Sequence, residues 1–121
     1  MYFNIEERNY KITNASVDFD EYSKEWRIII ENRDVFVEFF PLKLNGATKP
    51  DDLLNQVFDK EDFRYSKVCE GETVYLISHL IMKTMVTNDI KIMQVYGTGI
   101  LLEEEDIENE IHFEFCVDVN F

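Results

Sequence analysis

The strongest constraint on the fold is an alternation of apolar and polar residues near the end of the chain. Ile111, Phe113, Phe115, Val117 and Val119 occupy every second position, and the residues between them are mostly polar. Successive side chains of an extended strand point to opposite faces, so this period places all five on one face. A helix would scatter them around its circumference. The pattern predicts a strand over residues 111–119 with one buried and one exposed face.

A second strand is predicted upstream, over residues 90–102, where most apolar side chains share one parity. Gly97 and Gly99 share the other parity, and glycines within a strand favour a bulge, a bend or a closely packed neighbour. The turn residues 87–89 join this strand to residues 73–86 as a hairpin. Residues 73–86 are apolar on both parities, which also allows a buried helix. Their β-branched residues favour a strand.

The N-terminal half supports further strands and one helix. Residues 26–31 alternate, residues 32–34 form a turn, and residues 35–40 form the return strand, whereas residues 10–19 are a weaker candidate. Thr48, Pro50 and Asp51 resemble a helix start, and an apolar stripe follows from Leu53 to Phe58. This predicts a helix running to about Lys60 that covers a sheet face or plugs a barrel end.

These segments predict one β-rich α+β domain over residues 1–121. We expect six to eight mostly antiparallel strands, arranged as a sandwich or barrel, with one or two short helices packed on them. The length of 121 residues fits a single domain. An apolar fraction of 45% provides enough side chains for one core and argues against a disordered chain.

The charge distribution is strongly uneven. The formal net charge is −13, from 25 acids and 12 bases. Residues 92–121 hold eight of the acids and no Lys or Arg, because Lys91 is the last base in the chain. Such a field repels phosphate, so direct binding to nucleic acid or to an anionic membrane is not expected. It favours a cationic partner, or simple solubility.

No motif predicts catalysis, a metal or a cofactor. Cys69, His79, His112 and Cys116 are possible metal ligands, but none has zinc-finger spacing. Gly97-Thr98-Gly99 is not a dinucleotide-binding motif. No nucleophile, base and orienting group can be identified from their spacing. We therefore expect a protein that is not an enzyme and that uses neither a metal nor another cofactor.

The acidic segment 103–110 allows two interpretations. The simpler one is a solvated loop between two strands. The other is a docking surface for a basic protein, favoured because uncompensated acids repel one another and lower the stability of the compact state. The residues predicted to pair with the partner's Lys and Arg are Glu103, Glu104, Glu105, Asp106, Glu108 and Glu110, with Glu114 and Asp118 on the adjoining strand.

In its size, its acidity and its lack of catalytic motifs, the chain resembles the small immunity proteins of bacterial toxin systems. That resemblance implies a cytoplasmic protein that neutralises a nuclease-like toxin by occlusion. Phage-encoded inhibitors share the same traits. Two other hypotheses stay open: an assembly subunit that pairs through sheet edges, and a β-barrel that binds a small apolar ligand. The first residues do not predict a secretion signal, and two cysteines are too few for a disulfide framework, so a cytoplasmic location is expected.

Overall fold

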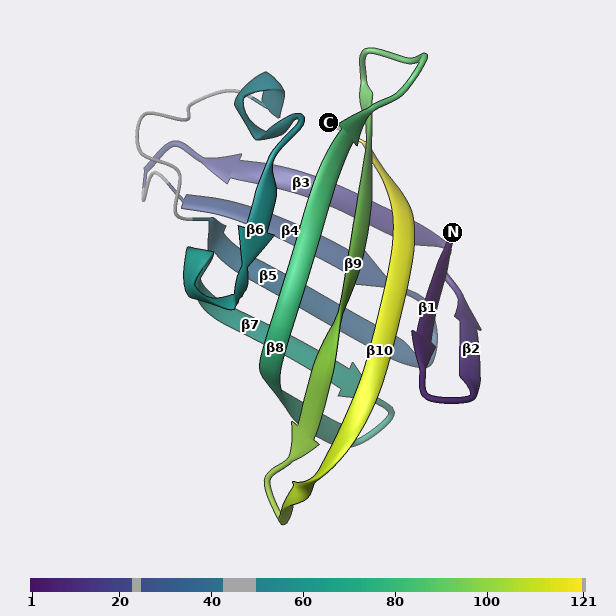
Figure 1. Ribbon diagram of the computed structural model, residues 1–121. Helices are drawn as coiled ribbons and strands as arrows, with labels where there is room; N and C mark the ends of the chain where they lie inside the picture. Colours follow the sequence, from purple (N-terminus) through teal and green to yellow (C-terminus); the bar gives the residue numbers. More distant parts are fainter. Residues whose placement is uncertain (23–24, 43–49, 121) are drawn as a thin grey trace.

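The computed structural model describes residues 1–22, 25–42 and 50–120. Within them, the chain forms a closed barrel of seven strands with three additional strands (Figure 1). The barrel strands are β3 (Asn14–Asp20), β4 (Glu25–Glu31), β5 (Val35–Leu42), β7 (Phe63–Glu70), β8 (Thr73–Val86), β9 (Ile92–Glu103) and β10 (Asp106–Asn120). The additional strands are β1 (Tyr2–Ile5), β2 (Arg8–Lys11) and β6 (Val57–Asp59). Two short 3₁₀ helices accompany them, η1 (Pro50–Leu53) and η2 (Lys60–Asp62).

The barrel consists of two layers that join at both sides (Figure 1). Strands β3, β4, β5 and β7 form one layer, and β8, β9 and β10 cross in front of it. On one side β7 and β8 pair as a hairpin, with Val68 opposite Tyr75. On the other side β10 and β3 run parallel, with Asn120 opposite Ser16. The β1–β2 hairpin extends the sheet beside β10, and β6 extends it beside β8.

Alternate side chains of the strands fill the barrel with a single apolar core. In β10 the buried residues are the five that the alternation predicted, and each is less than 10% exposed. Phe115 stacks on Phe3 of β1 at 5.3 Å and on Phe39 of β5 at 5.7 Å between ring centroids. The strand predicted over residues 111–119 is therefore confirmed, and its inward face forms the centre of the core.

Several other predicted strands are also present. Residues 73–86 form one strand, β8, and not the alternative helix. The predicted hairpin joins it to β9, although β9 begins at Ile92. The strands around Trp26 and Val35 are β4 and β5, as predicted. The weak candidate over residues 10–19 is divided between β2 and β3.

The predicted helix over residues 48–60 is wrong for the part that the structure describes; Thr48 lies outside the described residues. Only η1 is helical in its first half, and β6 follows at Val57. Asn55 adopts a left-handed backbone with φ of 56°, which ends the helical turn. The Gln56 amide donates to Thr84 Oγ1 at 3.0 Å, so the backbone pairs with β8 instead of with itself. The fold is thus mostly β, with almost no helix.

The two glycines of β9 make room for close neighbours, as their position in the strand predicted. A Cβ atom on Gly97 would lie 2.3 Å from the Phe115 ring, and one on Gly99 would lie 1.9 Å from the backbone oxygen of His79. The register between β8 and β9 shifts at this point, between Ile77 and His79. Gly99 therefore accommodates a bulge in β8.

We predict that Gly99→Ala lowers the free energy of unfolding by about 3 kcal/mol or more, because backbone must move to admit the new methyl group. Gly97→Ala should cost less, since it displaces an aromatic side chain. Thr98→Ala, at the exposed position between them, is the matched control and should cost less than about 1 kcal/mol. Urea unfolding of the three variants measures this, and equal losses for Gly99→Ala and Thr98→Ala would contradict it.

Candidate functional site

The acidic segment is a β-hairpin and not a loop. Only Glu104 and Glu105 form the turn between β9 and β10. β10 begins at Asp106, opposite Glu103, and its register shifts before Ile111 pairs with Leu101. The interpretation of residues 103–110 as a loop is therefore wrong. We call residues 103–110 the acidic hairpin; they form one end of the barrel's front layer (Figure 1).

The carboxylates of the acidic hairpin face water and form no ion pair with the residues that the structure describes. All of its acids are exposed except Glu103, which is half-buried. Among the described residues, the ion pairs are Arg8 with Glu70 and Arg27 with Glu38, both outside this segment. Glu72, in the neighbouring β7–β8 turn, borders a shallow groove with Glu103, Glu104 and Glu105. The β7–β8 turn therefore adds to the negative charge at this end.

The structure places the other two predicted residues away from the acidic hairpin. Glu114 and Asp118 lie on the outward face of β10, about 13 Å and about 27 Å from Glu110 at the usual rise per residue. Tyr2 donates a hydrogen bond to Glu114 Oε1 at 2.6 Å. This bond, together with burial, raises the pKa of Tyr2 to about 12. Six of the eight predicted residues thus form one group, while Glu114 is bound to the molecule's own β1.

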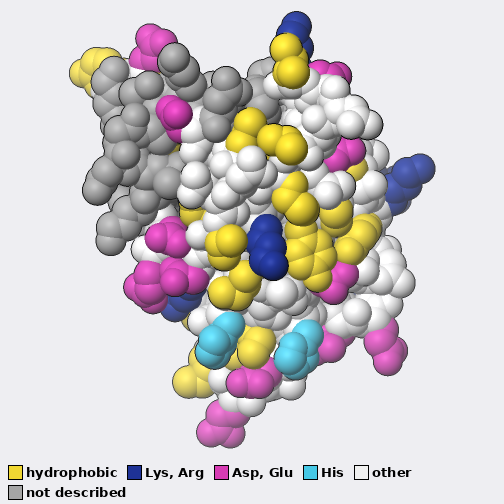
Figure 2. Space-filling view, turned by 45° about the horizontal axis from the view of Figure 1, so that its top comes forward, with side chains coloured by type: hydrophobic (Ala, Val, Ile, Leu, Met, Phe, Trp, Pro, Cys, Tyr) yellow, Lys and Arg dark blue, Asp and Glu magenta, His cyan; other side chains and the backbone are white. Residues whose placement is uncertain are grey.

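An exposed apolar surface lies beside the acidic hairpin, on the outward face of β8 and β9, and sequence reasoning did not assign it to the site. Val74, Leu76 and Ile81 are 47–48% exposed. Leu102 lies opposite Leu76, and Ile100 lies opposite His79. Figure 2 shows hydrophobic side chains gathered on this face, with basic and histidine side chains among them and acidic ones towards its margins. The signal was present in the sequence, because residues 73–86 are apolar on both parities.

A small polar cleft borders this apolar surface. It is lined by Asn4, Glu6, Thr98, His112, Phe113 and Glu114. Glu6 Oε1 accepts a hydrogen bond from the His112 backbone amide at 3.0 Å. Asn4 Oδ1 is buried and has no hydrogen-bond partner among the described residues. A buried acceptor without a donor is unfavourable, so the cleft is suited to a ligand that donates a hydrogen bond.

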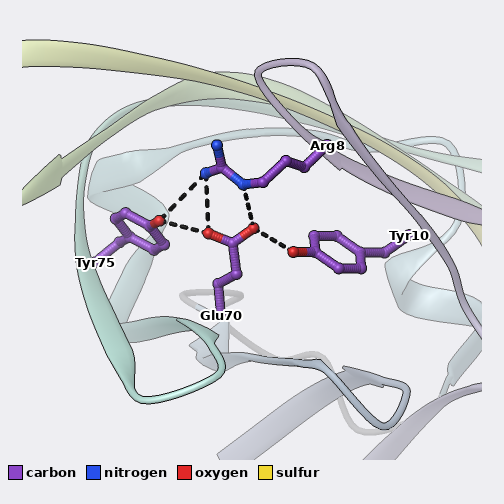
Figure 3. A network of polar contacts seen from close by, with 4 residues as sticks. All are labelled: Arg8, Tyr10, Glu70 and Tyr75. Atoms are coloured by element: carbon purple, nitrogen blue, oxygen red, sulfur yellow. Dashed lines mark hydrogen bonds and ion pairs between the residues drawn. The ribbon is translucent and has the colours of Figure 1, made fainter.

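A polar network ties the β1–β2 hairpin to the β7–β8 hairpin (Figure 3). Arg8 donates to both carboxylate oxygens of Glu70, at 2.6 Å and 2.9 Å. Tyr75 donates to Glu70 Oε1 at 2.7 Å, and Tyr10 donates to the other oxygen. Three side chains from two strands, β2 and β8, therefore converge on the Glu70 carboxylate of β7.

The network shifts the pKa values of its members in the directions that favour a charged Glu70. Partial burial alone would raise the pKa of Glu70, but the hydrogen bonds from its three partners outweigh it and hold the pKa below its ordinary value. Burial and the bond to Glu70 raise the pKa of Tyr75 to about 12. The bond to Glu70 also raises the pKa of Tyr10. The charges of Arg8 and Glu70 are paired with each other, which indicates that the network stabilises the structure by joining the two hairpins.

Other reactive groups in the part of the chain that the structure describes include Ser78 and His79, joined by a hydrogen bond between Oγ and Nδ1 at 2.6 Å, and two cysteines. Cys69 and Cys116 are free, half-buried thiols. Burial, with a contribution from Asp118, raises the pKa of Cys116, which disfavours the nucleophilic thiolate. No group of three His, Cys, Asp or Glu side chains is placed to hold a metal ion within the described residues.

Comparisons with models of protein families, with curated proteins and with solved structures find no match to this chain. Across the described residues, no helix has the length and apolar character needed to cross a membrane.

We predict that Glu70→Gln lowers the free energy of unfolding by about 2 kcal/mol at pH 7, because it removes a carboxylate bound by three donors. The folded-state pKa of Glu70 lies below its ordinary value of 4.5, so its contribution is present above that pH and is lost on further acidification. The difference between the two proteins should therefore shrink below about pH 4.

Denaturant unfolding at several pH values measures this difference. Glu72→Gln is the matched control, since Glu72 is exposed two residues away, and it should change stability by less than about 0.5 kcal/mol. A Glu70→Gln loss that stays constant from pH 7 to pH 3 would refute the role given to the charge.

Proposed function

We propose that this protein is a non-enzymatic binding protein that neutralises a cationic protein partner by covering its functional surface. The acidic hairpin is the element that meets the partner's Lys and Arg side chains. The observation that carries the proposal is the concentration of exposed acids in residues 103–110 without an ion pair to the described residues. If the acids served only to keep the protein soluble, we would expect them to be interspersed with bases, as they are in the first 91 residues.

The physical consequence of this arrangement is a fast encounter with a basic protein. Opposite potentials steer two proteins together and raise association rate constants towards roughly 10⁸–10⁹ M⁻¹s⁻¹ at low salt. The effect weakens as salt shortens the Debye length, which is about 10 Å at 0.1 M. A field at one end of the molecule also orients the partner, because the acidic hairpin is approached first.

Within this class, we propose an immunity protein that protects a bacterial cytoplasm from a nuclease-like toxin. A nuclease must present a basic groove to phosphate, and an acidic hairpin can occupy that groove. Pairs of colicin nucleases and immunity proteins are among the tightest protein complexes known, so binding alone can hold a nuclease inhibited. A phage-type inhibitor is the alternative within the class, and it would use the same surface.

Two other classes have less support. An assembly subunit would pair through sheet edges, but the edge strands of the described sheet, β2 and β6, are only four and three residues long. Exposed Arg8 and Lys11 further disfavour pairing at the β2 edge. A barrel for an apolar ligand needs space inside, whereas Phe3, Phe39 and Phe115 stack across this one.

The test begins with the reading frame beside the gene for this chain, which the proposal predicts to encode a basic, nuclease-like toxin domain. We predict that the purified protein binds it and blocks its activity, and that replacing Glu104, Glu105 and Asp106 together by Lys slows association about tenfold or more at low salt. The wild-type association rate should fall steeply as salt rises, while that of the variant should not. Stopped-flow fluorescence measures both rates.

The matched control reverses three exposed acids away from the acidic hairpin, which changes the net charge equally: Asp18 and Glu21 in and after β3, and Asp89 in the β8–β9 turn at the opposite end of the front layer. It should slow association much less than the change in the acidic hairpin. Equal slowing by both variants would mean that net charge alone acts, and the acidic hairpin would lose its assigned role. No binding by the wild-type protein would overturn the proposed function itself.

A further inference from the structure

The outward face of β8 and β9 carries several apolar side chains that folding does not require, beside polar ones such as His79 and Lys83. The inward residues of β8, such as Leu80 and Met82, already pack in the core. Outward Leu76 and Ile81 are each 47% exposed. Polar residues at these positions would leave the core unchanged. A contiguous apolar patch rimmed by polar groups is characteristic of a protein–protein interface.

Cross-strand register shows how this surface is bounded. Ile81 lies opposite Asp59 of β6 on one side and opposite Thr98 of β9 on the other. Thr98 in turn lies opposite Glu114 of β10. At about 4.8 Å between strands, one row therefore places an acid on each side of Ile81 within about 10 Å. Along β8 the exposed outward neighbours of Ile81 are His79 and Lys83, so one base also lies within this surface. The acidic hairpin borders the end of the surface nearest Val74, which lines a shallow groove with Glu103 and Glu104.

The polar cleft described above adjoins this row, since Thr98 belongs to both. Asn4 lies opposite Glu114, so the unpartnered Asn4 Oδ1 lies beside a carboxylate. An acceptor and a carboxylate together match the donors of a guanidinium or ammonium group. The cleft is therefore suited to bind one Arg or Lys side chain.

We infer that the outward face of β8 and β9 is the contact surface for the cationic partner, with Leu76, Ile100 and Leu102 at its apolar centre and Ile81 beside them. One Arg or Lys of the partner enters the cleft beside Asn4 and Glu114. The inference rests on the proposed function and deepens it by assigning the partner a defined surface: an apolar cluster surrounded by basic residues. The acids at the margin meet those basic residues.

Charge decides between such a partner and a second copy of this chain. With a net charge of −13, two copies that meet through acid-rimmed faces would bring like charges together. A basic partner turns the same margins into attractive contacts. The charge of the margins therefore argues for a different protein as the occupant.

The apolar face and the acidic hairpin act on different rate constants. Long-range attraction from exposed acids changes the association rate, whereas buried contacts at the centre of an interface mainly change dissociation. Association rates therefore test the role of the acidic hairpin, and dissociation rates test the role of the apolar face separately.

The first measurement is the oligomeric state by sedimentation at concentrations up to the millimolar range. We expect a monomer. A dimer that Ile81→Ser converts to a monomer would show that a second copy occupies the face, and it would overturn the inference.

The second measurement is the dissociation rate of the complex with the neighbouring toxin domain. We expect Ile81→Ser to accelerate dissociation about tenfold or more and to leave association within about twofold. Tyr65→Ser is the matched control, because Tyr65 is 48% exposed on β7 in the back layer, and it should leave dissociation unchanged. Asn4→Ala should accelerate dissociation about threefold to tenfold if a cation donates to Asn4.

Thermal unfolding establishes that the variants are folded. If charge reversal in the acidic hairpin slows association while Ile81→Ser and Tyr65→Ser dissociate like the wild type, the proposed function stands and the apolar face is not the contact surface. If the wild-type protein does not bind the toxin domain, both proposals fail.

Discussion

The stacking of Phe115 between the two layers is the interaction on which the rest of the structure depends. Its ring lies against Phe3 of β1 and Phe39 of β5, so one side chain joins the additional strands, the front layer and the back layer. Gly97 leaves the space that this ring occupies. Removal of either neighbour would leave a void in a close-packed interior, where a deleted aromatic ring costs about 3–5 kcal/mol.

A filled interior has a consequence for the outside of the same strands. Because the inward residues of β8–β10 satisfy the core, their outward residues are constrained only by solubility and by binding. The network at Glu70 adds a second connection, because Arg8 of the additional strand β2 binds Glu70 at the end of the barrel strand β7. The front layer is therefore supported from within and at its end. It can present its outward face as a rigid surface, and rigidity lowers the entropic cost of binding.

The sequence predicted the strands far better than the way they close. Alternation in residues 111–119 identified the inward face of β10, because burial on one face leaves a period of two. The helix at residues 48–60 was wrong because the same apolar spacing suits a chain that packs Leu53 and Phe58 into the core from a turn and a short strand. The parallel contact of Asn120 with Ser16, which closes the barrel, joins residues far apart in the chain and leaves no local pattern.

The candidate site shows the same division. Exposure of the acidic hairpin could be predicted, since a run of acids is stable only in water. The hydrogen bond that Glu114 accepts could not, because Tyr2, which donates it, comes from the opposite end of the chain. The apolar face could not be predicted, because a strand that is apolar on both parities fits two arrangements. Both of its faces can be buried in the protein, or one face can be exposed, and only the tertiary structure shows that one face of β8 is exposed.

In the proposed function, the apolar face and the acidic hairpin have different roles in binding the partner. Exposed ion pairs contribute about 0–1 kcal/mol each, because water screens them and the side chains lose freedom. A surface of acids alone would therefore bind a basic protein quickly and release it quickly. Burial of apolar area contributes about 25 cal/mol per Å² and acts only at contact. A protein that must stop a lethal activity needs both properties, rapid capture and slow release. The neighbouring positions of Val74 and the acidic hairpin supply both within one continuous surface.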